Sequence, residues 1–300
     1  MGERIRIGYG LGTGASSDAE RLLTLVDALD ANRFDSLWLS ERVAAPAPDP
    51  VVGLAVAAGR SPRLKLGTSV LVVPGRNPVL LAKSLATLDR LSGGRLLPAF
   101  GLGVADPIEQ QGFGVARGER AEWFDEAVPL IRRLWTGEPV DHDGPRFHYQ
   151  GVRVEPRPVQ DPPDVWLGGR APSELRRVGR LGDGWLPSFC TAAEAEAGRR
   201  LIKEEADRCG RAIDPGHWGA LVIYTRGGEV PERLGRALAA RRPDVDPRDL
   251  IAVGLAEARA RLEQFIAVGF SKFVLAPAHE PPSWDDELGE VADAVLDLQA

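Results

Sequence analysis

The sequence predicts an α/β fold, a (β/α)8 TIM barrel with an insertion near residues 140–160. The first observation is a series of about eight short, nearly continuous apolar stretches, the number of strands in such a barrel. The second is that amphipathic helical segments separate most of them, which is typical of a parallel sheet covered by helices. The third is a composition without any shift that would mark a linker, so we expect one domain over residues 1–300. A doubly wound open sheet is the alternative fold.

The first half of the chain alternates strands and helices regularly. Its strands are predicted at 4–10, 34–40, 64–73 and 95–103. Between the first two, Ser17 and Glu20 have the spacing of a capping box before a helical apolar stripe. Asn77 and Pro78 are typical of a helix start, and the stretch LSGGR is typical of its end. A long amphipathic helix is predicted over 119–136.

The second half begins with the insertion. The Asp143-Gly144 pair stands among alternating apolar residues in 140–160, which predicts a β-hairpin. Further strands are predicted at 164–169, 183–189, 217–225 and 271–277. Helices are predicted from 172 onward, up to about 208, over 258–269 and near 284–298. Residues 226–254 show no clear pattern.

The bulk composition excludes several classes of function. Lys and Arg number 37 and Asp and Glu 43, so the formal net charge of −6 favours neither nucleic acid nor an anionic membrane as a partner. The first ten residues carry charges where a signal peptide has its apolar region, and we expect a cytoplasmic protein. Cys190, Cys209 and the four scattered histidines lack metal-site spacings, so we expect reduced thiols and no metal.

Three short motifs invite a functional interpretation. GLGTGA, residues 10–15, matches a dinucleotide-binding pattern, but the chain has 34 glycines and Asp35 opens the second strand instead of ending it. LGGRAP, residues 167–172, ends a strand just before a helix, where free N–H groups beside Arg170 would form an anion cradle. The alternative is an ordinary turn with an exposed arginine. Glu41, after the second strand, is either a pocket acid or a solvated residue paired with Arg42.

Three stretches together resemble the luciferase-like monooxygenase superfamily: residues 64–103, 118–140 and 158–188. Its members are TIM-barrel oxidoreductases that use FMN or the deazaflavin F420. The resemblance implies that the third strand ends in a bulge with a non-prolyl cis peptide at Ser69–Val70, on which the cofactor ring rests. Thr68 and Ser69, which interrupt the apolar strand, would then face a ligand. The implied cofactor-binding residues are Ser69, Val70, Gly103, Gly168, Gly169 and Arg170.

The resemblance favours F420 over FMN, because residues 168–170 match the stretch where F420 members hold the phosphate end of the cofactor. In the F420-dependent glucose-6-phosphate dehydrogenases, a catalytic histidine and a tryptophan follow the acid after the second strand, and a glutamate follows the Gly-x-Gly of the fourth. Glu41 matches the acid, but Arg42, Pro46 and Val104 occupy the other three places. Oxidation of an alcohol requires a base for the hydroxyl proton, so this reaction is disfavoured.

The sequence therefore predicts an F420-dependent oxidoreductase that transfers a hydride between the deazaflavin and a small organic substrate, reducing an activated C=C or C=N bond. Glu41 is the predicted proton relay, and we expect residues 41–50 and the insertion at 140–160 to shape the substrate pocket. One alternative is a two-component monooxygenase that uses reduced FMN and dioxygen. Another is a non-catalytic F420-binding barrel that acts as a carrier or sensor. The family resemblance also implies a homodimer.

Overall fold

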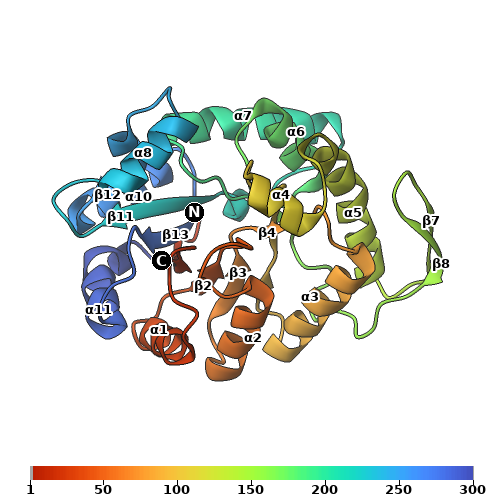
Figure 1. The fold of residues 1–300 in the computed structure, drawn as a ribbon, viewed down its shortest axis with the longest axis horizontal. Helices are drawn as coiled ribbons and strands as arrows, with labels where there is room; N and C mark the ends of the chain where they lie inside the picture. The colour runs from red at the N-terminus through yellow and green to blue at the C-terminus, as the bar shows by residue number, and fades with distance from the viewer. Residues whose placement is uncertain (1–2, 300) are drawn as a thin grey trace.

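The computed structural model describes residues 3–299, so residues 1, 2 and 300 of the predicted domain lie outside the described residues. Parallel strands form the centre of the molecule and helices surround them (Figure 1). The parallel strands are β1 (Arg6–Leu11), β2 (Ser36–Leu39), β3 (Lys65–Thr68), β4 (Leu71–Val72), β5 (Leu96–Leu97), β6 (Ala99–Gly101), β9 (Trp166–Leu167), β10 (Gly184–Trp185), β11 (Gly219–Thr225), β12 (Ile251–Val253) and β13 (Lys272–Pro277). They form one sheet in the order β12-β11-β13-β1-β2-β3-β5 and a second in the order β10-β9-β6-β4.

The two sheets meet at two places, so the strands follow one another around a ring. Only Pro98 separates β5 from β6, and a parallel bridge between Trp185 and Trp218 joins β10 to the start of β11. The Leu221 N–H donates to the carbonyl of Pro187 at 3.1 Å beside this bridge. The predicted (β/α)8 fold is confirmed, although its backbone hydrogen bonds divide it into two sheets instead of one continuous cylinder.

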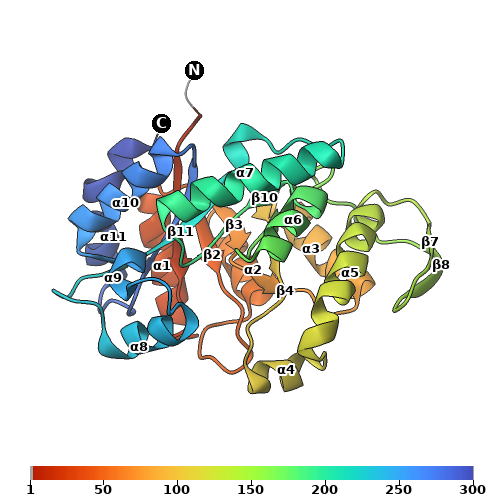
Figure 2. The ribbon, with the colours of Figure 1, turned by 90° about the horizontal axis from the view of Figure 1, so that it is seen from above.

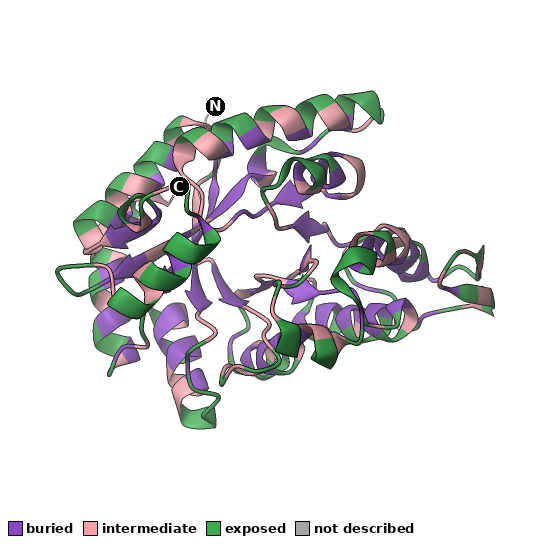
Figure 3. Cartoon of the chain, turned by 45° about the horizontal axis from the view of Figure 1, so that its top comes forward, coloured by how far each residue is buried: buried purple, intermediate pink, exposed green. Residues whose placement is uncertain are grey.

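Helices cover the outside of the strands and expose their outer faces to solvent (Figures 2 and 3). They are α1 (Ala19–Ala31), α2 (Pro50–Arg60), α3 (Pro78–Ser92), α4 (Pro107–Phe113), α5 (Arg120–Trp135), α6 (Pro172–Leu181), α7 (Ala192–Arg208), α8 (Glu232–Arg241), α9 (Pro247–Leu250), α10 (Leu255–Ala267) and α11 (Trp284–Val295), with short 3₁₀ turns at Arg117–Glu119, Pro215–His217 and Leu296–Leu298. Asn77 caps α3 as predicted. The cap of α1 is Asp18, which accepts from the N–H groups of Glu20 and Arg21, and the prediction of a Ser17 cap is wrong by one residue.

The insertion is the predicted antiparallel hairpin, formed by β7 (Val140–Asp143) and β8 (His148–Val152). Phe147 packs edge-on against Trp123 of α5, with ring centroids 5.3 Å apart, and His142 lies 2.8 Å from Glu126. In both Figure 1 and Figure 2 the hairpin projects outward beyond α5, away from the strands. The expectation that the hairpin shapes a substrate pocket at the strand ends is therefore wrong.

The stretch without a clear pattern contains α8, α9 and β12. β12 pairs with the C-terminal half of β11 and was missed in the sequence, because three residues carry too short a pattern. α8 exposes nearly all of its side chains, with only Leu238 buried, so its apolar stripe is too narrow to recognise.

Two tryptophans fill the interior of the strand ring. Trp38 and Trp166 belong to a buried cluster that is separate from the core between strands and helices, and that also contains Ala99, Leu186 and Val274. Glycines on the neighbouring strands give the indole rings their space. A Cβ atom on Gly67 would lie 2.1 Å from Cε3 of Trp38, and one on Gly184 would lie 2.5 Å from Cδ2 of Trp166. The ring of strands therefore encloses a packed core.

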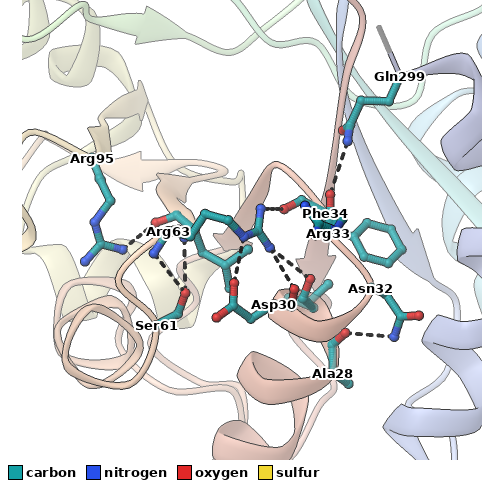
Figure 4. A network of polar contacts seen from close by, with 11 residues as sticks. Ala28, Asp30, Asn32, Arg33, Phe34, Ser61, Arg63, Arg95 and Gln299 are labelled. Atoms are coloured by element: carbon teal, nitrogen blue, oxygen red, sulfur yellow. Dashed lines mark hydrogen bonds and ion pairs between the residues drawn. The ribbon is translucent and has the colours of Figure 1, made fainter.

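Arginines connect the helix ends to the starts of the strands at the base of the molecule. Figure 4 shows Arg63, whose guanidinium donates to the carboxylate of Asp30 and to the carbonyl of Phe34, both at 2.8 Å. Arg95 repeats the arrangement one unit further, donating to the carbonyl of Leu64 at 2.6 Å. Carbonyl groups at helix ends lack intrahelical partners, and these guanidiniums satisfy several of them.

Candidate functional site

The peptide bond between Ser69 and Val70 is cis, as the family resemblance implied. The Ser40 hydroxyl at the end of β2 donates to the carbonyl of Ser69 at 2.8 Å, and the two hydroxyl oxygens lie 3.1 Å apart. Ser69 is half-buried, as a residue at a ligand-facing edge would be. Thr68 is not at this edge. It is fully buried, and its hydroxyl donates to the carbonyl of Ala99 and accepts from the N–H of the same residue, so the expectation for Thr68 is wrong.

Val70 lies between two glycines of the neighbouring strands. A Cβ atom on Gly101 would lie 2.5 Å from Cγ2 of Val70, and one on Gly168 would lie 3.1 Å from Cγ1. Val70 packs on the inner cluster and is only half-buried, so it offers apolar surface where β6 and β9 end. A flat ring fits against such a surface, because glycine lets it approach the backbone closely.

Gly103 lies against the guanidinium of a buried arginine, Arg120. Its φ is +78°, and a Cβ atom there would lie 3.1 Å from Nη1 of Arg120. Arg120 is 2% exposed and donates through Nη1 to the carbonyls of Leu102 and Val104, at 3.1 and 3.0 Å. Its Nη2 is buried without a hydrogen-bond partner in the described part of the chain. No pattern in the sequence indicated this role, since an arginine in the first turn of an amphipathic helix is usually exposed.

Glu41 is a buried residue at the end of β2, with a side chain 6% exposed. Its carboxylate accepts from the N–H of Val72 at 2.7 Å and pairs with Arg76. The alternative of a solvated residue paired with Arg42 is therefore wrong. Burial raises the pKa of Glu41, and the nearby charge of Asp49 adds to this, although Arg76 opposes it. A carboxyl group in such surroundings retains its proton to a higher pH than usual.

Arg42 pairs with two acids on the segment after β6, Asp106 at 3.2 Å and Glu109 at 3.0 Å. Glu109 of α4 is 2% exposed and also accepts from the N–H groups of Val43 and Ala44, at 3.0 and 3.2 Å. Burial opposes the charged form, but these hydrogen bonds and the charge of Arg42 outweigh it and lower the pKa of Glu109. Glu109 therefore fixes the loop after β2, which we expect to border the substrate.

Replacing Glu109 with alanine is expected to open this loop. Losing charge-assisted hydrogen bonds to a buried carboxylate costs roughly 1–3 kcal/mol, so amide exchange of residues 42–47 should accelerate about tenfold or more. Because the folded-state pKa is lowered, the stabilisation is present above the unfolded pKa and is lost as pH falls through the folded value. Hydrogen exchange with mass spectrometry measures both effects. Glu196→Gln on the exposed side of α7 is the control, and equal protection in both variants would contradict the prediction.

The start of α6 differs from the predicted anion cradle. The N–H groups of Arg170 and Ala171 both donate to the carboxylate of Glu174 at 2.9 Å, so neither is free. Glu174 lies three residues after Ala171 and supplies the glutamate half of a capping box, but Ala171 has no hydroxyl for the other half, so the full signal was absent from the sequence. Gly169 has a φ of +95°, and its carbonyl accepts from the indole N–H of Trp185 at 2.8 Å.

A second arginine, which the sequence did not reveal, lies near Arg170. The guanidinium of Arg241, at the end of α8, lies 5.5 Å from the ring centre of Phe189. Burial lowers the pKa of Arg241, and the positive charge of Arg170 lowers it further. Within residues 3–299 neither guanidinium forms an ion pair or donates a hydrogen bond. The adjacent Arg242 holds the end of α8 in place through Glu194 at 2.5 Å.

The position of Asp35 bears on the dinucleotide-binding interpretation. Asp35 pairs with the buried Lys272 at the starts of β2 and β13, far along the strands from the loop after β1, so the dinucleotide-binding interpretation of residues 10–15 has no acid at its site. No group of three His, Cys, Asp or Glu residues in the described chain is arranged to hold a metal ion. No described helix is long and apolar enough to span a membrane.

Comparison of the sequence with known proteins shows the family of this chain. The family model of the luciferase-like monooxygenases matches residues 4–238. An F420-dependent glucose-6-phosphate dehydrogenase of Nakamurella multipartita is 28% identical over 317 aligned positions, covering 92% of each chain. A phthiodiolone/phenolphthiodiolone dimycocerosates ketoreductase of a Mycobacterium species (strain JLS) is 30% identical, covering 78% of this chain and 70% of the relative.

Comparison of the structure with solved structures gives matching folds. A solved F420-dependent secondary alcohol dehydrogenase, in complex with an F420–acetone adduct, superposes with a TM-score of 0.83 at 18% sequence identity, over 99% of this chain and 100% of that one. Because the family model matches most of this chain, residues 4–238, the chain belongs to the luciferase-like monooxygenase family.

Proposed function

We propose that this protein is an F420-dependent oxidoreductase that transfers a hydride between the deazaflavin and a small organic substrate. The observation that carries the proposal is the half-buried Val70, which follows a cis peptide and lies between Gly101 and Gly168. The relatives named as F420-dependent support the choice of cofactor. Ser69, Val70, Gly103, Gly168 and Gly169 border the ring.

The residues present fit a cofactor with an anionic end. Arg170 and Arg241 are like charges close enough to interact, and neither forms an ion pair among the described residues, so an anion that binds between them would be favoured. The N–H groups at the start of α6 already donate to Glu174. We therefore assign the phosphate end of F420 to the two guanidiniums, which are suited to bidentate contacts with phosphate oxygens.

The side chains around the ring favour reduction of an activated C=C or C=N bond. Reduced F420 supplies the hydride when bound, and the protein supplies orientation, a dry surface and a proton. Arg42 is unsuited to act as a base for an alcohol, because its guanidinium stays protonated and forms ion pairs with Asp106 and Glu109. The carbonyl of Val104 accepts from Arg120, and its apolar side chain has no group that could accept the proton of an alcohol.

Glu41 is the proposed proton donor. Its raised pKa keeps the acid form to a higher pH, so the rate of substrate reduction should fall as pH rises through this pKa. Glu41→Gln should remove that limb of the pH profile, and Glu41→Asp should shift it. Stopped-flow oxidation of reduced F420 between pH 5 and pH 9 measures this, with circular dichroism to confirm folding, because Arg76 loses its partner. An unchanged limb in Glu41→Gln would exclude the role.

A binding titration tests the proposed function as a whole. The purified protein should bind F420 tightly and reduced FMN weakly, which is followed by fluorescence quenching. Tight binding of reduced FMN together with dioxygen consumption would establish the two-component monooxygenase instead. F420 binding without hydride transfer to any member of a panel of enones and imines would favour the non-catalytic carrier or sensor. We also propose that the protein is a single barrel domain and that it is cytoplasmic. The family resemblance supports the further proposal that it forms a homodimer.

A further inference from the structure

A cavity of about 240 Å³ lies at the base of the molecule, between α5 and α6 and apart from the Val70 surface. Leu181 ends α6 just before β10 begins, and Arg211 precedes β11, so the cavity lies at the N-terminal ends of these strands. The active residues of TIM barrels lie at the opposite end. The lining residues are Val128, Pro129, Arg132, Arg180, Leu181 and Arg211.

Positive charge exceeds negative charge around this cavity. Arg132 and Arg211 share the carboxylate of Asp183, at 2.6 and 3.0 Å. Arg180 shares Asp125 with the buried Arg177, which lies 2.5 Å from the same carboxylate while Arg180 lies at 3.3 Å.

Four guanidiniums therefore share two carboxylates, which leaves a formal charge of +2 in this group. Asp164, which lies 3.5 Å from His217, also interacts electrostatically with Arg132, and counting this carboxylate leaves a formal charge of +1. A concave surface with unbalanced charge of one sign concentrates counter-ions.

Several donors of these arginines have no protein partner. Arg180 uses only Nη2, and Arg132 also uses only Nη2, for Asp183 and for the carbonyl of Leu181. Their Nε and Nη1 groups donate to nothing within the described residues. The base of the cavity is rigid, because Arg211 also donates to the carbonyls of Gly179 and Gly182, both at 2.8 Å. Arg211 is thus held in place before any ligand arrives, and Arg132 and Arg180 are each held through Nη2.

We propose that this cavity binds a phosphate group, either inorganic phosphate or the phosphate of a small metabolite. The fork of a guanidinium matches the oxygens of phosphate, and the unused N–H groups of Arg132 and Arg180 are the donors. Val128, Pro129 and Leu181 form an apolar wall that accommodates the carbon skeleton of an ester. The site is distinct from the proposed cofactor site, which lies at the other end of the strands.

Thermal unfolding in the presence of inorganic phosphate tests the proposal. At constant ionic strength, the unfolding temperature of the intact protein should rise as phosphate is added, with the logarithmic dependence on concentration that binding to one site of the folded state gives. Arg180→Gln should weaken the apparent affinity about tenfold, because the variant loses the fork while Asp125 keeps its pairing with Arg177. Arg180→Lys, which keeps the charge but not the fork, should give an intermediate affinity. A parallel titration with glycerol phosphate shows whether an ester binds more tightly than the free ion.

Two control variants show whether phosphate binds in this cavity or elsewhere on the protein. Arg208→Gln on α7 removes an exposed arginine paired only with Glu205, and should leave the phosphate response unchanged. Arg170→Gln removes any contribution from phosphate bound at the proposed cofactor site, and the part of the response that Arg180→Gln weakens should remain. A response lost in Arg170→Gln but kept in Arg180→Gln would place the phosphate at the cofactor end and overturn the proposal. No rise in the unfolding temperature, or equal rises in all variants, would overturn it as well. If Arg180→Gln does not fold, equilibrium dialysis of labelled phosphate compares Arg180→Lys with the wild-type protein, and equal affinities would overturn the proposal.

Discussion

Gly67→Ala is expected to lower the free energy of unfolding by about 3 kcal/mol, the upper part of the range for an overpacked core. The new Cβ atom would lie 2.1 Å from Cε3 and 2.2 Å from Cδ2 of Trp38, a fully buried ring. The indole cannot move aside, because its N–H donates to Ser36 Oγ at 2.8 Å and the inner cluster surrounds it. Urea unfolding followed by tryptophan fluorescence measures the change.

The matched control is Gly59→Ala in α2, where a Cβ atom would meet nothing within 4 Å. Alanine there should stabilise the protein by about 0.5–1 kcal/mol, because glycine is the poorer helix former. If both variants change stability by the same amount, the interior of the strand ring is not tightly packed around Trp38. Trp38→Phe combined with Gly67→Ala should recover part of the loss, which a nonspecific effect of alanine would not do.

Arg170→Gln together with Arg241→Gln is expected to weaken F420 binding about 100-fold or more, because each of the two charge-assisted contacts contributes roughly 1.5 kcal/mol or more. The deazaflavin fragment without phosphate and glutamate should bind the double variant as well as it binds the wild type. This difference separates loss of an anion contact from general damage to the site. Fluorescence titrations with the two ligands at one ionic strength provide the measurement, because salt weakens exposed charge interactions.

Arg236→Gln is the control on the same helix, since Arg236 is exposed and pairs with Glu232 one turn away. It should retain wild-type affinity for F420. Equal losses for both ligands in the double variant would mean that α8 positions the ring instead of holding the phosphate. Full affinity for F420 in the double variant would remove these arginines from the site.

Local patterns in the sequence predicted the fold well. The turn pair Asp143-Gly144 indicated the hairpin, and Asn77-Pro78 marked the start of α3, because turns and caps depend on a few adjacent residues. The cis peptide came from the resemblance and was confirmed at Ser69–Val70.

Partners of polar side chains could not be predicted in the same way. Glu41 pairs with Arg76 of the following strand–helix connection, and Thr68 bonds to Ala99 across the sheet. These contacts depend on strand register and on how loops fold back, which residue spacing does not specify. Arg241 was missed because α8 has a narrow apolar stripe and resembles a polar loop in its pattern. The cofactor-binding residues inferred from resemblance remain predictions until ligand binding is measured.

The arginine contacts at the base have a consequence for salt tolerance. Arg63 and Arg95 donate largely to neutral carbonyl groups, and only four of the chain's 37 basic residues are lysines. Mobile ions screen attraction between full charges far more than they weaken a hydrogen bond to a buried dipole. Molar salt would therefore weaken the exposed ion pairs of this protein but leave intact the arginine contacts that join one strand–helix unit to the next.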